Sequence, residues 1–242
     1  MSFLNQLPKI VFIIIILLSA NCEVVHAQTS GKFILLDGPH KFSAGDNPRW
    51  VSPEYDDSKW QQIKVPGSWQ SLGIKSEKGM GWYRIHFNIP DGFNIYLPAV
   101  LIGRIGDVDE VFFNGVKIGG EGIIGDRFVE ATKVERLYTV PPNLINYSKD
   151  NILAVRVMNT YLNGGIFDKG IAFGEFDLFM LEKVKREKVI IVIEYCLFTF
   201  FAMFFLASFF LYIKGLRDKE YIFFWLFISL YGLLVFFGSI TF

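Results

Sequence analysis

The chain has two regions with different patterns of apolar and polar residues. Residues 28–181 contain short apolar runs separated by Gly, Pro and Asn, whereas residues 189–213 and 221–242 are almost continuously apolar. Residues 82–89 alternate strictly, with apolar side chains at Tyr83, Ile85, Phe87 and Ile89. A period of two is typical of a strand with one buried face. The pattern predicts β structure in the first region and helices in the second.

Other strands are expected in the first region. We place them at residues 97–103, 110–113, 152–157 and 172–180, the last with an inner face of Ala172, Phe176, Leu178 and Met180. No run of ten or more residues there has helical spacing. Several short strands divided by turn residues, without helices, are typical of a sandwich. The predicted fold class is therefore an all-β jelly-roll sandwich ectodomain, residues 28–181, followed by two transmembrane α-helices.

A hairpin is predicted at Asn114-Gly115. Apolar runs at residues 111–113 and 116–118 flank this pair. Asn-Gly between two such runs is the strongest short signal for a hairpin, because a type I′ turn needs a positive φ at both central residues.

Three glycines that follow the hairpin have the spacing GxGxxG. They are Gly120, Gly122 and Gly125. A dinucleotide-binding loop of this kind lies between a strand and a helix. Here a hairpin precedes the glycines and residues 126–129 have no helical face, so we expect permissive loop positions and no cofactor.

The N-terminal residues 1–27 have the features of a secretory signal peptide. Lys9 ends a short polar start, residues 10–20 are apolar, and residues 25–27 offer a cleavage site. The apolar run is shorter than the ~20 residues that span a bilayer, which argues against an uncleaved anchor. Cleavage before Cys22 with lipidation of that cysteine stays an alternative.

Residues 189–213 and 221–242 are each long enough to cross a membrane. Their one charged residue is Glu194. A carboxylate inside a membrane is by default a functional candidate. Glu194 is also close enough to the start of its span to reach the interface, so both interpretations stay open.

Positive charge gives a mixed signal for orientation. The turn at residues 214–220 carries three basic residues, while the linker at residues 182–188 carries four. Long domains cross the membrane largely regardless of their charge. The signal peptide therefore decides the expected topology, with the sandwich outside and the turn in the cytoplasm.

Composition excludes several classes of function. Acidic and basic residues balance at 24 each, which gives no reason to expect a nucleic-acid partner. His40 and His86 have no recognisable second ligand, so no metal site is expected. There is no GxSxG elbow, and Cys196 falls inside a predicted membrane helix. No catalytic residue is assigned.

An ordered set of residues resembles the sugar-binding domain of family 2 glycoside hydrolases, a galactose-binding-like jelly roll. The residues are Trp50, Asp56-Asp57-Ser58, Trp60, Val65-Pro66-Gly67-Ser68-Trp69, Gly81-Trp82-Tyr83-Arg84, Leu101, Gly103-Arg104-Ile105, Asp107, Asp109-Glu110-Val111-Phe112-Phe113-Asn114-Gly115 and Asn151 with Leu153-Ala154-Val155-Arg156-Val157. The resemblance covers about residues 35–180. In that family this domain is an accessory, and catalysis belongs to a barrel that this sequence does not contain, so the chain as it stands is not expected to be an enzyme.

Carbohydrate recognition needs aromatic faces together with hydrogen-bonding groups. The candidate ligand-binding residues are Trp50, Trp69, Trp82, Arg84, Arg104, Asp107 and Asn163. The competing expectation is that most of these tryptophans belong to the core. A small molecule or a glycan is the expected ligand.

The order of a sandwich, a membrane helix and a short basic turn is similar to bacterial seven-transmembrane sensors with diverse intracellular signalling modules. That resemblance implies a sandwich outside the inner membrane, in the periplasm, acting as the input of a signalling receptor. Only two of seven helices are present and the chain stops at Phe242, which indicates a truncated reading frame or a fragment. A homodimer through the membrane helices is a further expectation. The alternatives are a non-catalytic accessory fragment of a glycoside hydrolase, or a structural membrane-anchored domain without a ligand.

Overall fold

The computed structural model describes residues 33–74, 79–124, 128–147, 149–160 and 164–214, together with positions 227 and 232. The predicted signal peptide with Cys22, the candidate Asn163, and almost all of the second predicted membrane span lie outside the described residues.

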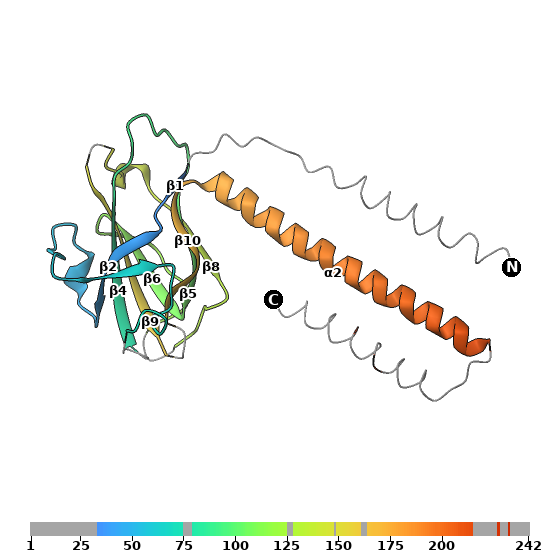
Figure 1. Cartoon of the computed structure of the whole chain (residues 1–242). Helices are drawn as coiled ribbons and strands as arrows, with labels where there is room; N and C mark the ends of the chain where they lie inside the picture. The colour runs from blue at the N-terminus through green and yellow to red at the C-terminus, as the bar shows by residue number, and fades with distance from the viewer. Residues whose placement is uncertain are drawn as a thin grey trace. The chain divides into compact units, whose positions relative to one another are not determined.

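Two antiparallel sheets form a β-sandwich (Figure 1). The four-stranded sheet has the order β1 (Phe33–Leu35), β10 (Gly165–Glu175), β5 (Pro98–Gly106) and β8 (Glu135–Thr139). The six-stranded sheet has the order β3 (Gln61–Val65), β2 (Gly38–Ala44), β4 (Gly79–Phe87), β9 (Asn151–Asn159), β6 (Val108–Phe113) and β7 (Val116–Gly119). Two short 3-10 helices, η1 (Pro48–Val51) and η2 (Pro142–Leu144), lie in connections. The predicted all-β sandwich is confirmed.

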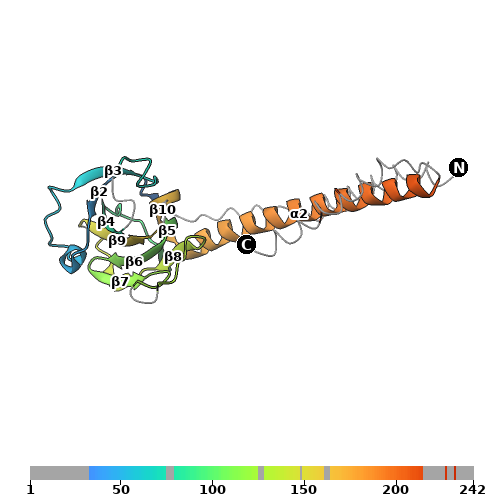
Figure 2. The same cartoon turned by 90° about the horizontal axis from the view of Figure 1, so that it is seen from below.

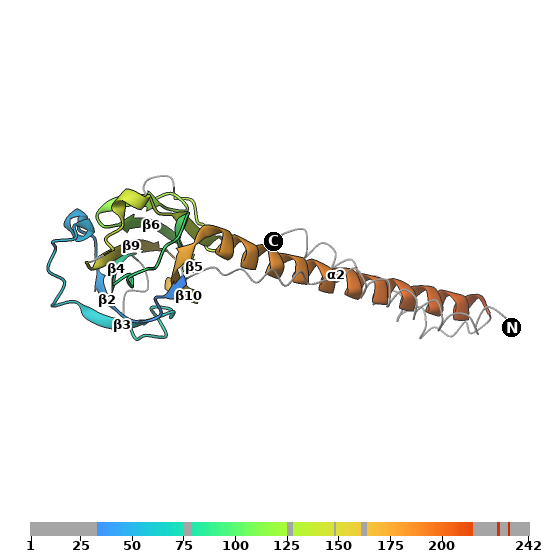
Figure 3. The same cartoon turned by 90° about the horizontal axis from the view of Figure 1, so that it is seen from above.

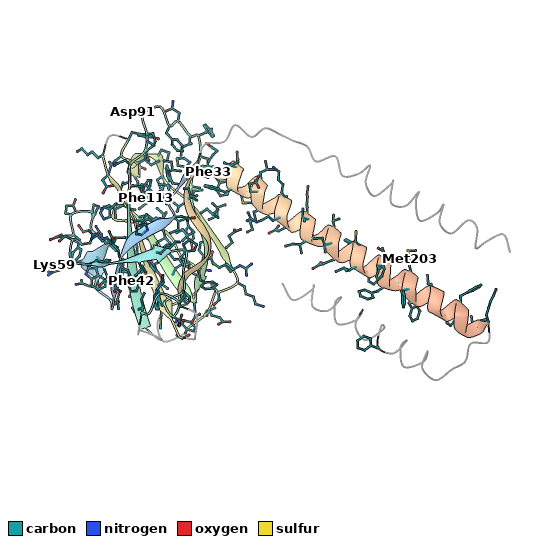
Figure 4. The ribbon with its side chains drawn as sticks, viewed as in Figure 1. Phe33, Phe42, Lys59, Asp91, Phe113 and Met203 are labelled. Atoms are coloured by element: carbon teal, nitrogen blue, oxygen red, sulfur yellow. The ribbon has the colours of Figure 1, made fainter. Side chains whose placement is uncertain are left out.

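The core lies between the two sheets. Strand β4 sends Tyr83, Ile85 and Phe87 inward, as its period of two predicts, and each is at least 93% buried. Phe113, from β6 of the same sheet, stacks on Phe173, from β10 of the other sheet, with ring centroids 5.9 Å apart. Figure 4 shows Phe42 and Phe113 within the sandwich. Aromatic side chains from both sheets therefore fill the interior.

The predicted hairpin is confirmed. Asn114 and Gly115, which join β6 to β7, have φ values of 46° and 87°. The Asn114 side-chain amide also donates to the carbonyl of Leu144 at 2.8 Å, and its oxygen accepts from the backbone N–H of Ile152 at 2.8 Å. The turn residue thus binds both the connection before β9, at Leu144, and the start of β9, at Ile152, which its local preference alone would not require.

The glycines after the hairpin belong to a loop. Gly122 has a φ of 83°, and Ile123 then forms an isolated bridge with Val129. Gly125 lies outside the described residues. A strand-to-helix turn is absent at Gly120 and Gly122, so the described part of the motif does not have the geometry of a dinucleotide cradle.

The predicted strand at residues 172–180 is wrong after Glu175. Helix α2 begins at Phe176 and continues to Ile213, so it also includes residues 182–188, which were expected as a linker. Phe176, Leu178 and Met180 alternate in sequence, but five residues satisfy a strand and a helix pattern equally well. Tertiary contacts decide: the N–H of Phe176 donates to the carbonyl of Leu97 at 2.9 Å.

Among the described residues, one helix is long and apolar enough to cross a membrane. The qualifying stretch is Phe176–Leu206 of α2, and its most apolar window is 0% buried. The first predicted span, residues 189–213, lies within α2. Figure 2 shows α2 leaving the sandwich from the side of β5, β8 and β10, and Figure 3 shows β5 and β10 beside the start of the helix. A helix with exposed apolar residues on every side is typical of a membrane anchor.

Candidate functional site

An aromatic cluster covers the outer face of the six-stranded sheet. Trp82 on β4 stacks on Phe112 of β6, with ring centroids 5.7 Å apart. The connection between β2 and β3 lays Trp50 edge-on against Trp82, at 6.2 Å, and against Trp60, at 5.0 Å. Tyr55 lies 5.9 Å from Trp60. We call Trp50, Tyr55 and Trp60 the aromatic loop; each is partly exposed.

Arg84 holds this connection in place. Its side chain is completely buried, and its Nε donates to Oδ2 of Asp57 at 2.7 Å. Its NH1 donates to the carbonyls of Trp50 at 2.6 Å and Ser52 at 2.9 Å. A buried guanidinium needs such partners because desolvation of the charge is costly. Arg84 was a candidate ligand-binding residue, but the structure commits it to the fold of the loop.

His86 extends the ion-pair network around Asp57. Its Nε2 lies 2.7 Å from Oδ2 of Asp57, and its Nδ1 lies 2.6 Å from Oδ2 of Asp150. Burial raises the pKa of Asp57, but the hydrogen bonds from His86 and Arg84 outweigh it and hold the pKa below its ordinary value. Asp57 is therefore ionised at neutral pH. No group of three potential metal ligands occurs within the part of the chain that the structure describes.

Arg136 is a second buried arginine that holds loop carbonyls in place, and the sequence did not predict this role. It is fully buried, and its Nε donates to Oδ1 of Asp109 at 2.7 Å. Its NH1 donates to the carbonyls of Ala131, at 2.8 Å, and Val134. Tyr138 donates its hydroxyl to the other oxygen of Asp109 at 2.9 Å. Burial raises the pKa of Asp109, although the Arg136 guanidinium acts in the opposite direction.

Asp107, another candidate, also binds its own chain. Its Oδ2 accepts from the backbone N–H and the hydroxyl of Thr160, both at 2.8 Å. Its Oδ1 accepts from the hydroxyl of Thr132 at 3.2 Å, and the residue is 4% exposed. Both oxygens are thus occupied by the loops at this end of the sandwich.

The three candidate tryptophans differ in exposure. Trp69 is 0% exposed and donates its indole N–H to the hydroxyl of Tyr83 at 2.7 Å. Trp82 is 1% exposed and donates to Oδ1 of Asp46 at 2.9 Å. Trp50 keeps part of its surface exposed, and among the described residues its buried indole N–H has no acceptor. Trp50 alone of the three has surface left for a ligand.

The remaining candidates, Arg104 and Glu194, lie away from the aromatic cluster around Trp50 and Trp82. Arg104 is exposed on β5, in the other sheet, where its register partner is Glu135. Glu194 is partly exposed on α2. The structure therefore brings Trp50, Trp82 and Arg84 together and separates them from Arg104 and Asp107.

A junction fixes α2 to the four-stranded sheet. Phe176 and Phe179 pack on Ala99 and Ala172, and Phe179 is 7% exposed. The carboxylate of Glu175, the last residue of β10, accepts from the backbone N–H groups of Tyr96 and Leu97, both at 2.8 Å.

Three turns further along α2, NH2 of Arg186 donates to both oxygens of Glu135 on β8, at 2.9 and 2.8 Å. The helix is thus held at two places, ten residues or about 15 Å apart. These contacts define the architecture as an all-β sandwich joined directly to a helix that is long and apolar enough to cross a membrane.

Comparison with known proteins gives the kind of sandwich. Residues 45–163, just under half of the chain, match the family model described as Beta-galactosidase second all-beta domain. A β-glucuronidase of Bacteroides uniformis is similar in structure, with 20% identity and a TM-score of 0.50 over 60% of this chain and 18% of that one. A β-glucuronidase from glycoside hydrolase family 2 has 17% identity and a TM-score of 0.52, over 63% of this chain and 18% of that one. No curated protein sequence matches the chain.

These similarities establish the fold at the level of the glycoside hydrolase family 2 β-sandwich. The chain spans about a fifth of the length of the solved enzymes it matches, and the matching part is their β-sandwich.

Proposed function

We propose that this chain is a membrane-anchored, non-catalytic recognition domain, in which a β-sandwich of the glycoside hydrolase accessory type presents a ligand-binding surface outside the membrane. The junction is the observation that carries the proposal. β10 runs into α2 without a linker, and Phe179 and the Arg186–Glu135 pair hold the helix on the sheet. A sandwich with such a support is placed at a defined position above the bilayer.

The aromatic loop is the surface that we assign to the ligand, a glycan. Partly exposed aromatic rings can stack on the apolar faces of sugar rings. Because Trp and Tyr side chains are rigid, they bury contact area with little loss of conformational entropy. Arg84 fixes the loop carbonyls at Trp50 and Ser52, so the rings are preorganised. The similarity to β-galactosidase and β-glucuronidase sandwiches supports a carbohydrate as the class of ligand.

The full chain in lipid nanodiscs, titrated calorimetrically with neutral and acidic saccharides, tests this assignment. We expect heat with at least one class, and about a tenfold loss of affinity in Trp60→Ala, as an aromatic contact of this kind contributes about 1–2 kcal/mol. Tyr96→Ala is the control, because Tyr96 is 93% exposed in a different connection. Absence of heat with every saccharide, or an equal loss in both variants, refutes the glycan assignment.

The second candidate function is the input domain of a bacterial signalling receptor in the inner membrane, with the sandwich in the periplasm. The junction favours it as well, because a rigid connection transmits a change in the sandwich to the helix. Signalling requires the ligand to bind two arrangements of the junction with different affinity. A second copy that pairs through the membrane helices would be the partner. Spin labels on both sides of the junction would show a ligand-dependent distance in this case and a constant distance for a passive anchor.

A further inference from the structure

The junction determines which end of the sandwich is closest to the membrane. α2 begins beside Leu97, near the start of β5, and runs toward Glu135, where β8 begins. Glu135 is the register partner of Arg104 at the opposite end of β5. The loop before β8 therefore lies at the end of the sandwich that α2 approaches as it leaves the sheet. Figure 1 shows β8 on the side of the sandwich next to α2.

Distances along the helix place this loop at the level of the lipid headgroups. Arg186 contacts Glu135, and the apolar run of α2 begins at Val189. Three residues of helix advance about 4.5 Å. A headgroup layer is about 5–8 Å thick on each side of the hydrocarbon core. Val134, the neighbour of Glu135, thus falls inside that layer when the apolar part of α2 lies in the core.

The side chains of the loop suit this position. Val134, Val129 and Ile123 are 40%, 44% and 49% exposed. Ile123 and Val129 exchange two backbone hydrogen bonds, at 3.0 and 3.3 Å, which hold them together on one ladder. We call Ile123, Val129 and Val134 the aliphatic loop face.

Basic side chains lie on α2 at the same level. Lys185 and Lys188 fall in the last turns before the apolar run, and the side chain of Lys185 is 41% exposed. Cations at this depth are attracted to lipid phosphates, and exposed aliphatic side chains gain by entering the interface.

We propose that the aliphatic loop face rests on the surface of the bilayer that contains α2, so that the sandwich has a second, peripheral membrane contact besides its anchor. The partner is the lipid headgroup region. This inference rests on the proposed membrane anchoring by α2 and goes beyond it, because an anchored sandwich could equally stand clear of the lipid. A lipid contact fixes the tilt of the sandwich and faces Asp107 and its loops toward the membrane.

The test uses the full chain in nanodiscs, in a background with Cys22→Ser and Cys196→Ser. Single cysteines at Val134→Cys and Val129→Cys carry an environment-sensitive fluorophore, and lipids carry a nitroxide quencher at the headgroup. Val116→Cys is the matched control: Val116 is 47% exposed, and it lies beside Phe113 at the end of β6 away from Asp107. We expect the labels at 134 and 129 to lose about half of their emission, and the label at 116 to keep it.

Leu206→Cys, at a position in α2 that is 62% exposed, reports membrane insertion through an acyl-chain quencher. Quenching at 206 without quenching at 129 and 134 overturns the loop contact and leaves the anchor intact. Absence of quenching at 206 overturns the anchor and the loop contact together. Arg186→Gln is expected to weaken quenching at 134 and preserve it at 206, whereas Lys117→Gln, which removes an exposed pair with Glu110 on the six-stranded sheet, preserves both.

Discussion

Replacement of Arg84 by methionine tests whether the aromatic loop depends on a buried charge. Methionine keeps most of the length and apolar surface of the side chain but removes the guanidinium. The change removes hydrogen bonds of 2.6 and 2.9 Å to two loop carbonyls and an ion pair of 2.7 Å with Asp57. Asp57 is 8% exposed and retains His86 as a partner.

Loss of one partner from a buried pair costs about 3–5 kcal/mol. We expect about 3 kcal/mol for Arg84→Met, at the low end of that range, because His86 still faces Asp57 and the loop can open to water. The measurement is urea unfolding of the full chain in nanodiscs, followed by fluorescence of the tryptophans around Arg84.

Lys117→Met is the matched control on the same face of the sheet. Its ion pair with Glu110 is 2.6 Å long, but the lysine side chain is 52% exposed, so its loss should cost about 0–1 kcal/mol. Equal losses in the two variants would refute the reasoning, since burial would then add nothing to the value of the pair.

Two further predictions concern the carboxylate of Asp57 and the junction at Phe179. The pKa of Asp57 is depressed in the folded state, so its stabilising contribution is present above the unfolded pKa of about 4 and is lost as the pH falls through the folded pKa. Unfolding free energy measured below about pH 4 should therefore fall with acidification, and less steeply in Asp57→Asn. Phe179→Ala should destabilise the junction by about 3 kcal/mol because it empties an apolar contact with Ala99 and Ala172. Hydrogen exchange at the start of α2 measures this effect, and unchanged protection of residues 176–186 would contradict it.

The features that depend on local physics were predicted correctly from the sequence. The alternation in residues 82–89 follows from the geometry of any strand with one buried face, and β4 has that face. Asn114-Gly115 is a hairpin because few other residues adopt two successive positive φ values. The apolar composition of residues 189–213 excludes a water-exposed helix in an ordinary soluble domain, and α2 contains this stretch.

The roles of individual polar and aromatic residues could not be predicted in the same way. Trp82 and Arg84 lie on the face of β4 that the alternation assigns to solvent, yet both are buried because they are covered by the connection between β2 and β3, which Arg84 contacts at residues 27 to 34 positions away in sequence. Arg136 lies at an inward-facing position of β8, where the strand pattern predicts an apolar residue. Its charge is tolerated there because Asp109 and the loop carbonyls accept its hydrogen bonds. Such partners are distant in the sequence, and no pattern within one segment reveals them.

The boundary between β10 and α2 shows most clearly which features depend on the sequence of one segment and which depend on tertiary contacts. The sequence by itself determined that the chain has a β domain followed by an apolar helix, because these properties depend on periodicity and composition within single segments. Only the tertiary structure decided that the helix starts at Phe176, that Phe179 packs on the sheet, and that Arg186 reaches Glu135. Residues 176–180 fit a strand or a helix equally well, and contacts with β5, β8 and β10 stabilise the helix.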